Sequence, residues 1–364
     1  MAVDLMILPY APATTSVGPN FNPAQFGSLP EGLRGMGTHV VYLAPNGDMF
    51  NLAGPGKGRQ GVRLARAMQG DQQWPFRQVT TTSPYMMGAV INRQEIPPRK
   101  YTVNIIIGSH APHMTEYQYR MAEARWWAGQ DETQDGWLGE YTRFSGWRWN
   151  PVRPDTQSGT VTTMDPTAFG NNASSWDLTW IATRPYFTKP ALYRTWEAAY
   201  SGAPTVPPET LVGSTWLDKL VAKKYYWGLL PLANSGDLPS YAQFFVSSPG
   251  QAVLQDNDST RLLPMPETTE SVGTYMVDSE PGKRTLTASN DPRDNLVFDF
   301  IRQSRILNFF LSGVANEGIP LQMTWGERFM YAIPPKTVVQ LMVGHSNPEG
   351  VITAVVPQRF KRAR

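Results

Sequence analysis

Histidines are the residues of this chain whose type and spacing come closest to a metal site. Of the four, His110 and His113 alone are close in sequence, and Glu116 could supply a third ligand; the other two are His39 and His345. A zinc site needs three or four ligands in a closed shell. Two loop histidines in a chain without cysteine are typical of solvated side chains, so we predict no metal ligand.

Two groups of carboxylates are candidates for glycoside hydrolysis. Asp131, Glu132 and Asp135 follow a predicted helix, and Glu267 and Glu270 lie near each other in a predicted loop. A glycosidase needs two carboxyl groups about 5 to 9 Å apart in a cleft, one of them with a raised pKa. The sequence places neither group in a cleft, which favours solvated loop residues. A polysaccharide-degrading enzyme is therefore the weakest of three alternatives.

Other catalytic motifs are missing from the sequence. The stretch Gly54–Gly58 (Gly-Pro-Gly-Lys-Gly) lacks the Gly-Lys-Ser/Thr ending and the following helix of a phosphate-binding loop, so we expect a plain loop. We find neither a Gly-X-Ser-X-Gly elbow nor a dinucleotide fingerprint. The absence of cysteine excludes thiolate chemistry and disulfides. We predict a non-enzymatic protein with no catalytic residue, no metal and no cofactor.

Aromatic and basic residues crowd one stretch of about 24 positions. They are Trp126, Trp127, Trp137, Tyr141, Arg143, Phe144, Trp147, Arg148 and Trp149. Such residues stack on bases or sugars, anchor protein interfaces, or fill a core. We favour a core combined with an assembly interface, and keep a glycan- or receptor-binding module as the alternative.

Composition indicates a folded protein of two domains. The chain has 364 residues, of which 41% are hydrophobic, and this excludes extensive disorder. The charged fraction of 17% is low and suggests that neighbours cover part of the surface. A net charge of +2 gives no case for a nucleic-acid binder. No apolar run approaches the roughly 20 residues that span a bilayer, and no secretory signal opens the chain, so we expect no membrane insertion.

The first half of the chain predicts an arm and a β domain with one helix. Residues 1–37 form a proline-rich N-terminal arm, and residues 38–200 form the domain. Two short β-rich runs flank Asn46-Gly47, which predicts a hairpin with a type I′ turn. Residues 101–107 and 176–182 alternate apolar and polar side chains, as half-buried strands do.

A helix is predicted at about residues 115–128. Thr115 and Gln118 have the spacing of a capping box. Apolar residues at helical spacing predict the buried face, which comprises Tyr117, Met121, Ala124 and Ala128.

The second half predicts a β-sandwich. Residues 201–219 form a proline-rich linker and residues 220–364 the second domain, which ends in a basic tail at Arg359–Arg364. We interpret the tail as solubilising charge at a frayed terminus. Short strands at this spacing are typical of a sandwich or barrel. The candidates are 241–247, 284–288, 295–301, 305–311, 321–332, 337–343 and 351–356.

The order of several short motifs resembles the distal tail proteins (minor tail proteins) of long-tailed phages, and is most similar to those of actinobacterial phages. The motifs of the first domain are the strand Arg99–Ile107, one helix and a tryptophan-rich segment that ends in Arg184-Pro185-Tyr186-Phe187. Those of the second are Asn234–Asp237 before a strand, Asn295–Asp299, and Ile333-Pro-Pro335-Lys-Thr337 before the last core strands.

The resemblance implies a mainly β fold, with a tail-tube-like N-terminal β-barrel or sandwich carrying one packed helix and a galectin-like C-terminal sandwich. It implies a structural protein of the virion tail tip, or baseplate, that is assembled in the host cytoplasm. Six copies would form a ring at the distal end of the tail tube. The implied partners are the tail tube protein, the tail hub and the tape-measure protein, with DNA only in transit through the ring.

Overall fold

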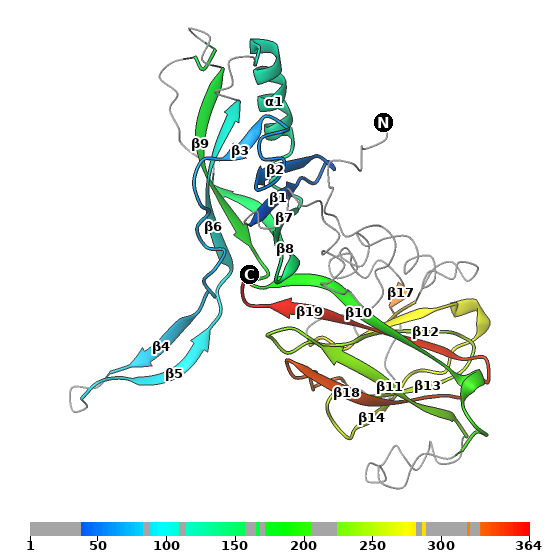
Figure 1. Cartoon of the computed structure of the whole chain (residues 1–364). Coiled ribbons are helices and arrows are strands. Elements are labelled where there is room, and N and C mark those ends of the chain that lie inside the picture. Colours follow the sequence, from blue (N-terminus) through cyan, green and yellow to red (C-terminus); the bar gives the residue numbers. More distant parts are fainter. Residues whose placement is uncertain are drawn as a thin grey trace. The chain divides into compact units, whose positions relative to one another are not determined.

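The computed structural model describes residues 38–82, 87–108, 114–156, 165–167, 172–205, 224–281, 286–288, 319–320 and 328–364 (Figure 1). The fold is mainly β, as predicted: the described residues hold many strands and one α-helix. The chain divides into two compact units, with residues 38–188 and 360–364 in the first and 189–359 in the second. The second unit differs from the predicted second domain at both of its ends. Residues 189–200 belong to the second unit, and residues 360–364 belong to the first. The predicted arm and most of the predicted linker lie outside the described residues.

The first unit is built from antiparallel strands that follow one pairing path. Its order is β2-β1-β7-β8-β9-β6-β3. The strands are β1 (His39–Leu43), β2 (Met49–Ala53), β3 (Val62–Leu64), β6 (Arg99–Gly108), β7 (Gly136–Thr142), β8 (Gly146–Thr156) and β9 (Ala173–Ala182). The long strand β8 joins two layers, because residues 146–152 pair with β7 and residues 153–156 with β9. Side chains from both layers and from the helix form one hydrophobic core.

The predicted alternation of β6 is confirmed. Tyr101, Val103, Ile105 and Ile107 are fully buried in this core. The β1–β2 hairpin is also confirmed, but the turn type was wrong. Gly47 has a positive φ of 87° whereas Asn46 does not, so the turn is not type I′. Pro45 fixes a negative φ at the first turn position, and the Gly47 N–H donates to the Ala44 carbonyl at 2.9 Å.

Helix α1 (Glu116–Ala128) begins where predicted, but its buried face was predicted wrongly. Thr115 and Gln118 form the capping box. The buried residues are Tyr119, Ala122 and Trp126, while Tyr117 and Met121 are exposed. Trp126 decides the orientation, because its fully buried ring packs against Tyr42, Phe50 and Trp180 in the core.

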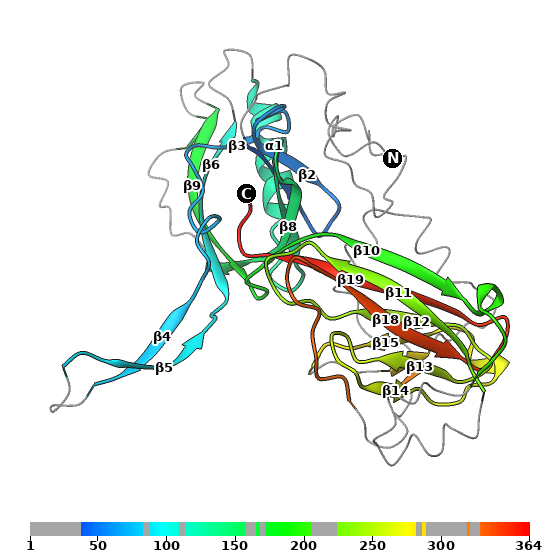
Figure 2. The same cartoon turned by 60° about the horizontal axis from the view of Figure 1, so that its bottom comes forward.

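The second unit is a sandwich of two antiparallel sheets. One has the order β10-β19-β12-β15-β16-β17 and the other β11-β18-β13-β14 (Figure 2). Their strands are β10 (Phe187–Glu197), β11 (Tyr226–Asn234), β12 (Gln243–Val246), β13 (Ala252–Gln255), β14 (Leu262–Pro264), β15 (Tyr275–Asp278), β16 (Leu286–Ala288), β17 (Ile319–Pro320), β18 (Thr337–His345) and β19 (Val351–Phe360). Both sheets contribute to one core, with Leu341 and Val343 from β18 packed in it along with Phe244 and Ile352 from the other sheet.

Four of the seven predicted strands of this unit have counterparts in β12, β16, β18 and β19. Predicted strands 295–301 and 305–311 lie outside the described residues, as does 321–327. Residues 328–332 are described and do not form the strand that was predicted there. In addition, the described residues contain no helix that is long and apolar enough to cross a membrane.

Candidate functional site: a pocket and an exposed hairpin in the first unit

The two described histidines have structural roles. The His39 Nε2 lies 3.1 Å from the Asn51 Oδ1, and burial lowers the pKa of His39. The His345 Nε2 lies 3.1 Å from the Ser247 carbonyl oxygen, and burial also lowers the pKa of His345. His110 and His113 lie outside the described residues. Within the described ranges, no group of three or more His, Asp or Glu side chains is placed to hold a metal ion.

Most of the carboxylates considered for hydrolysis are either held by other groups or exposed. The Asp131 Oδ1 accepts hydrogen bonds from the Thr133 hydroxyl and N–H, both at 2.7 Å, and these bonds lower the pKa of Asp131. Asp135 forms an ion pair of 2.9 Å with Arg153. Glu267 and Glu270 are exposed in the second unit. Glu132 lines a pocket.

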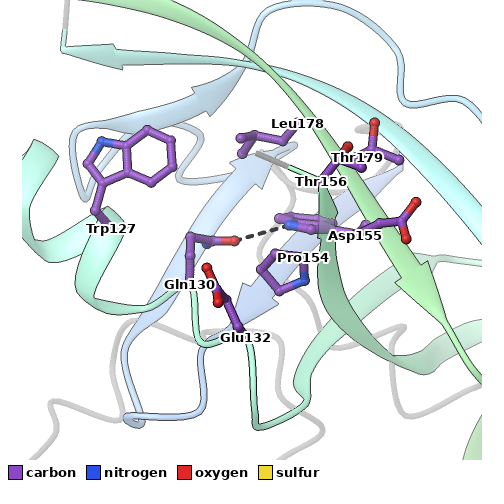
Figure 3. A pocket seen from close by; sticks show the side chains of 9 residues that line it. Trp127, Gln130, Glu132, Pro154, Asp155, Thr156, Leu178 and Thr179 are labelled. Carbon is purple, nitrogen blue, oxygen red and sulfur yellow. Dashed lines mark hydrogen bonds between the residues drawn. The ribbon is translucent and has the colours of Figure 1, made fainter. Parts of the chain in front are cut away.

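This pocket of about 540 Å³ lies wholly within the first unit. Three segments form its wall: the end of α1 and the loop after it, the last residues of β8, and the middle of β9. The lining residues are Trp127, Gln130, Glu132, Pro154, Asp155, Thr156, Leu178, Thr179 and Trp180 (Figure 3). The antiparallel pairing of β8 with β9, which sets Pro154 opposite Trp180, holds two of these segments in register.

Hydrogen bonds fix two polar groups of the pocket wall. The Gln130 Oε1 accepts a hydrogen bond of 3.0 Å from the Trp180 indole N–H. This bond sets the orientation of the amide, and the Gln130 Nε2 is left buried with no hydrogen-bond partner. The Asp155 Oδ2 accepts a bond of 2.8 Å from the Lys100 ammonium group. Glu132 extends from the loop below Gln130 (Figure 3).

The aromatic residues of this stretch differ in their surroundings. Trp126 is fully buried in the core, whereas Trp127 lies at the pocket and packs edge-on against Trp176 with ring centroids 5.0 Å apart. Trp147 and Trp149 stack on each other at 5.2 Å. The predicted core component is therefore confirmed for Trp126, while the interface component stays a prediction.

A two-stranded hairpin of the first unit is exposed along both strands. It consists of β4 (Arg77–Thr81) and β5 (Val90–Glu95), which pair only with each other. Figures 1 and 2 show it extending away from the remaining strands of that unit. Four apolar side chains of the hairpin and its base are between 48% and 57% exposed, namely Phe76, Val90, Ile91 and Ile96. Sequence reasoning missed this hairpin, since its strands lack a clear alternation of apolar and polar residues.

The basic tail was interpreted wrongly, because its last residues are anchored in the first unit. The Lys361 carbonyl accepts a bond of 2.6 Å from the buried Arg99 guanidinium group. The Arg364 side chain forms an ion pair of 3.1 Å with Asp71, and Ala363 is fully buried. The tail is therefore held by backbone and apolar contacts that a count of its charges does not indicate.

Arg99 has a structural role that sequence reasoning did not identify. Its guanidinium group donates to the carbonyls of Gly70 at 2.8 Å, Asp71 at 2.9 Å and Pro185 at 2.9 Å, in addition to Lys361. It also lies over the Phe187 ring, 5.0 Å from the centroid. The Arg184–Phe187 motif is thus fastened to the start of β6.

Comparison with known proteins gave a likeness among solved structures. No protein-family model matches the sequence, and neither does any curated protein. The chain is similar to the SPP1 Dit protein, described as a paradigm of the hub adsorption apparatus in phages that infect Gram-positive bacteria. The identity is 13% and the TM-score 0.48, over 89% of this chain and 99% of that one. It is also similar to a chain of the phage P2 baseplate in its activated conformation, in the calcium and strontium forms, at 7% identity with the same TM-score and coverage.

Proposed function

We propose that this chain is a structural component of a bacteriophage tail tip, forming a ring at the distal end of the tail tube. The ring joins the tube to the tail hub and lets DNA pass. The ordered sequence motifs support the phage-tail assignment. The exposed β4–β5 hairpin is the structural observation that carries the ring, because it is a protruding element that the described part of the chain leaves uncovered.

A neighbouring subunit is the partner that this hairpin fits. Two-stranded hairpins are marginally stable in water and gain stability when they pack on another element. Each subunit of a cyclic ring presents one patch and receives a different one, so a protruding arm on one side can pack on the next copy all around the ring. Half-exposed Val90 and Ile91 provide apolar area for that contact.

The finer parts of the proposal rest on the sequence resemblance. They are a hexamer, first units that form the ring and its channel, and galectin-like second units that point outward. The same holds for the partners, which are the tail tube protein, the tail hub and the tape-measure protein, and for assembly in the cytoplasm of an actinobacterial host. No residue of the chain is assigned a catalytic step.

Electron microscopy of negatively stained protein, combined with mass photometry, tests the ring. We expect closed rings for the wild-type chain, formed alone or after mixing with the purified tube and hub proteins. Ile91→Asp should give folded monomers with a nearly unchanged melting temperature, since the Ile91 side chain is 57% exposed and lies outside the core of the unit. Met121→Asp is the matched control, because Met121 is an equally exposed apolar residue on α1, and it should still form rings. Rings formed by Ile91→Asp, or only monomers of the wild type in every mixture, would contradict the proposal.

A further inference from the structure

We propose that the outward face of α1 pairs with the same face of a second copy of this chain, with the two helices antiparallel. The α1 stripe, as we call this face, consists of exposed apolar side chains at helical spacing, namely Tyr117, Met121, Ala124 and Ala128. The pairing goes beyond the proposed ring and does not depend on it, because the β4–β5 hairpin shares no residue with the stripe.

The α1 stripe lies on the side of the helix opposite the core. Successive residues of an α-helix are turned by about 100°, which sets the stripe nearly half a turn away from buried Tyr119, Ala122 and Trp126. Tyr117 is 74% exposed and Met121 is 55% exposed, and both alanines are exposed as well. The helix therefore has two apolar faces, one in the core and one in solvent. A contiguous apolar stripe of this kind is typical of a helix that packs on a partner.

The sizes of the stripe residues make the face complementary to itself when the helices are antiparallel. The two large side chains occupy the N-terminal half of the stripe and the two small ones occupy the C-terminal half. In an antiparallel pair about a two-fold axis, Tyr117 of each copy lies opposite Ala128 of the other. Met121 likewise lies opposite Ala124. Large side chains then fill the space above small ones, whereas a parallel pair would set large against large and leave a gap between the alanines.

The charges around the α1 stripe favour an uncharged partner surface. No stripe residue is charged, and the arginines beside it are held by carboxylates of their own chain. Arg120 forms ion pairs of 3.3 Å with Glu123 and 3.0 Å with Asp165. The Arg125 Nε donates to the Asp48 Oδ1 at 2.8 Å. A charged partner surface would lose hydration without gaining a free counterion, whereas the stripe of a second copy brings no charge to bury.

The α1 stripe is small, and its area sets the strength of the pairing. Covering the exposed parts of Tyr117 and Met121 removes roughly 250 Å² of each copy from water, and the alanines and arginine stems bring the total for both copies to roughly 800 Å². Stable interfaces bury about 1,200 to 2,000 Å². We therefore expect a reversible dimer of single copies with a dissociation constant on the order of 0.1 to 1 mM. A ring would present several stripes at once, so two rings would hold together far more tightly.

Sedimentation velocity of the full chain measures this dimer when the ring contact is absent. Ile91→Asp removes the proposed ring contact. This variant should be monomeric at the nanomolar concentrations of mass photometry and form dimers as its concentration approaches about 0.5 mM. Adding Met121→Asp should remove the dimer over the same range, since a carboxylate would be buried against the second copy. Adding Phe144→Asp instead is the matched control, because Phe144 is 95% exposed outside α1, and it should change the dissociation constant by less than about twofold.

Exchanging the sizes of two facing residues tests the antiparallel arrangement separately from hydrophobicity. In the Ile91→Asp background, Ala124→Met alone sets large against large and Met121→Ala alone leaves a gap, so each should weaken the dimer at least about fivefold. The double variant again has one large and one small residue at each contact, and should bind within about twofold of the background. Both positions are exposed, so the melting temperature should stay unchanged. The proposal is overturned if no dimer forms up to about 0.5 mM, if Met121→Asp dimerises as well as the control, or if the double variant binds no better than the single ones.

Discussion

Replacing Arg99 by methionine should destabilise the first unit more than any surface substitution in the chain. Arg99 is 1% exposed, and its guanidinium group donates to four backbone carbonyls that belong to three separate segments of the unit. Methionine has a similar length and no donor. The substitution would leave the carbonyls of Gly70, Asp71, Pro185 and Lys361 without this partner.

The loss of free energy of unfolding depends on how many hydrogen bonds Arg99 donates and on the fact that one side chain donates them all. A hydrogen bond to a charged group contributes about 1.5 to 3 kcal/mol, and a cation–π contact such as that with Phe187 adds about 0.5 to 2 kcal/mol. The four bonds are not additive, and removing a buried charge also removes its desolvation cost. We therefore expect the free energy of unfolding to fall by about 3 to 5 kcal/mol.

Urea unfolding, followed by hydrogen exchange and mass spectrometry, measures this loss for each unit. Peptides from β6 and β9 should lose protection, while those from β12 and β13 in the second unit should keep it. Arg66→Met is the matched control, since Arg66 is exposed and its 3.4 Å ion pair with Asp177 is worth no more than about 1 kcal/mol. A loss below about 1 kcal/mol for Arg99→Met would refute the reasoning.

Two further predictions concern the same end of the first unit. Burial, and secondarily the charge of Asp71, raise the pKa of Glu140 from 4.5 to about 8. Between these pH values the folded chain keeps a proton on Glu140 that the unfolded chain has lost, so the free energy of unfolding should fall as the pH rises. Glu140→Gln should remove this fall, as measured by urea titrations at pH 5 and pH 8. Deleting residues 360–364 removes buried Phe360 and the Lys361 carbonyl, and should lower the melting temperature by several degrees, whereas Arg362→Gln, which alters only an exposed charge, should not.

The sequence predicted correctly those features that depend on residues close together along the chain. The capping box of α1 depends on two residues three positions apart, and both bonds are present. The alternation of β6 depends on neighbours two positions apart, and every predicted inward residue is buried. The β1–β2 hairpin formed for the same reason, although Pro45 selected a different turn.

Long-range contacts explain the failures. The face of α1 was decided by Trp126, whose ring partners Tyr42 and Trp180 lie far away in sequence. The tail was predicted to be solvated because four of its six residues are basic. Its partner Arg99 lies more than 250 positions earlier in the sequence. Composition cannot reveal either contact.

The pocket could be foreseen only in fragments. The sequence singled out Trp127 and Glu132, one as an aromatic anchor and the other as a possible hydrolytic carboxylate. Neither interpretation identified Gln130, whose unpaired amide exists only because the Trp180 indole, 50 positions later, fixes its orientation. A polar group whose orientation is set by so distant a partner has no sequence motif.

The proposed ring needs a rigid first unit. Arg99 and the anchored tail tie the base of β6 to distant segments, which fixes the frame from which the β4–β5 hairpin projects. A hairpin that packs on a neighbour needs such a frame, because a small rotation at its base would displace its apolar residues by a large distance at the contact. A rigid first unit can therefore present the β4–β5 hairpin to a neighbouring subunit in a fixed orientation.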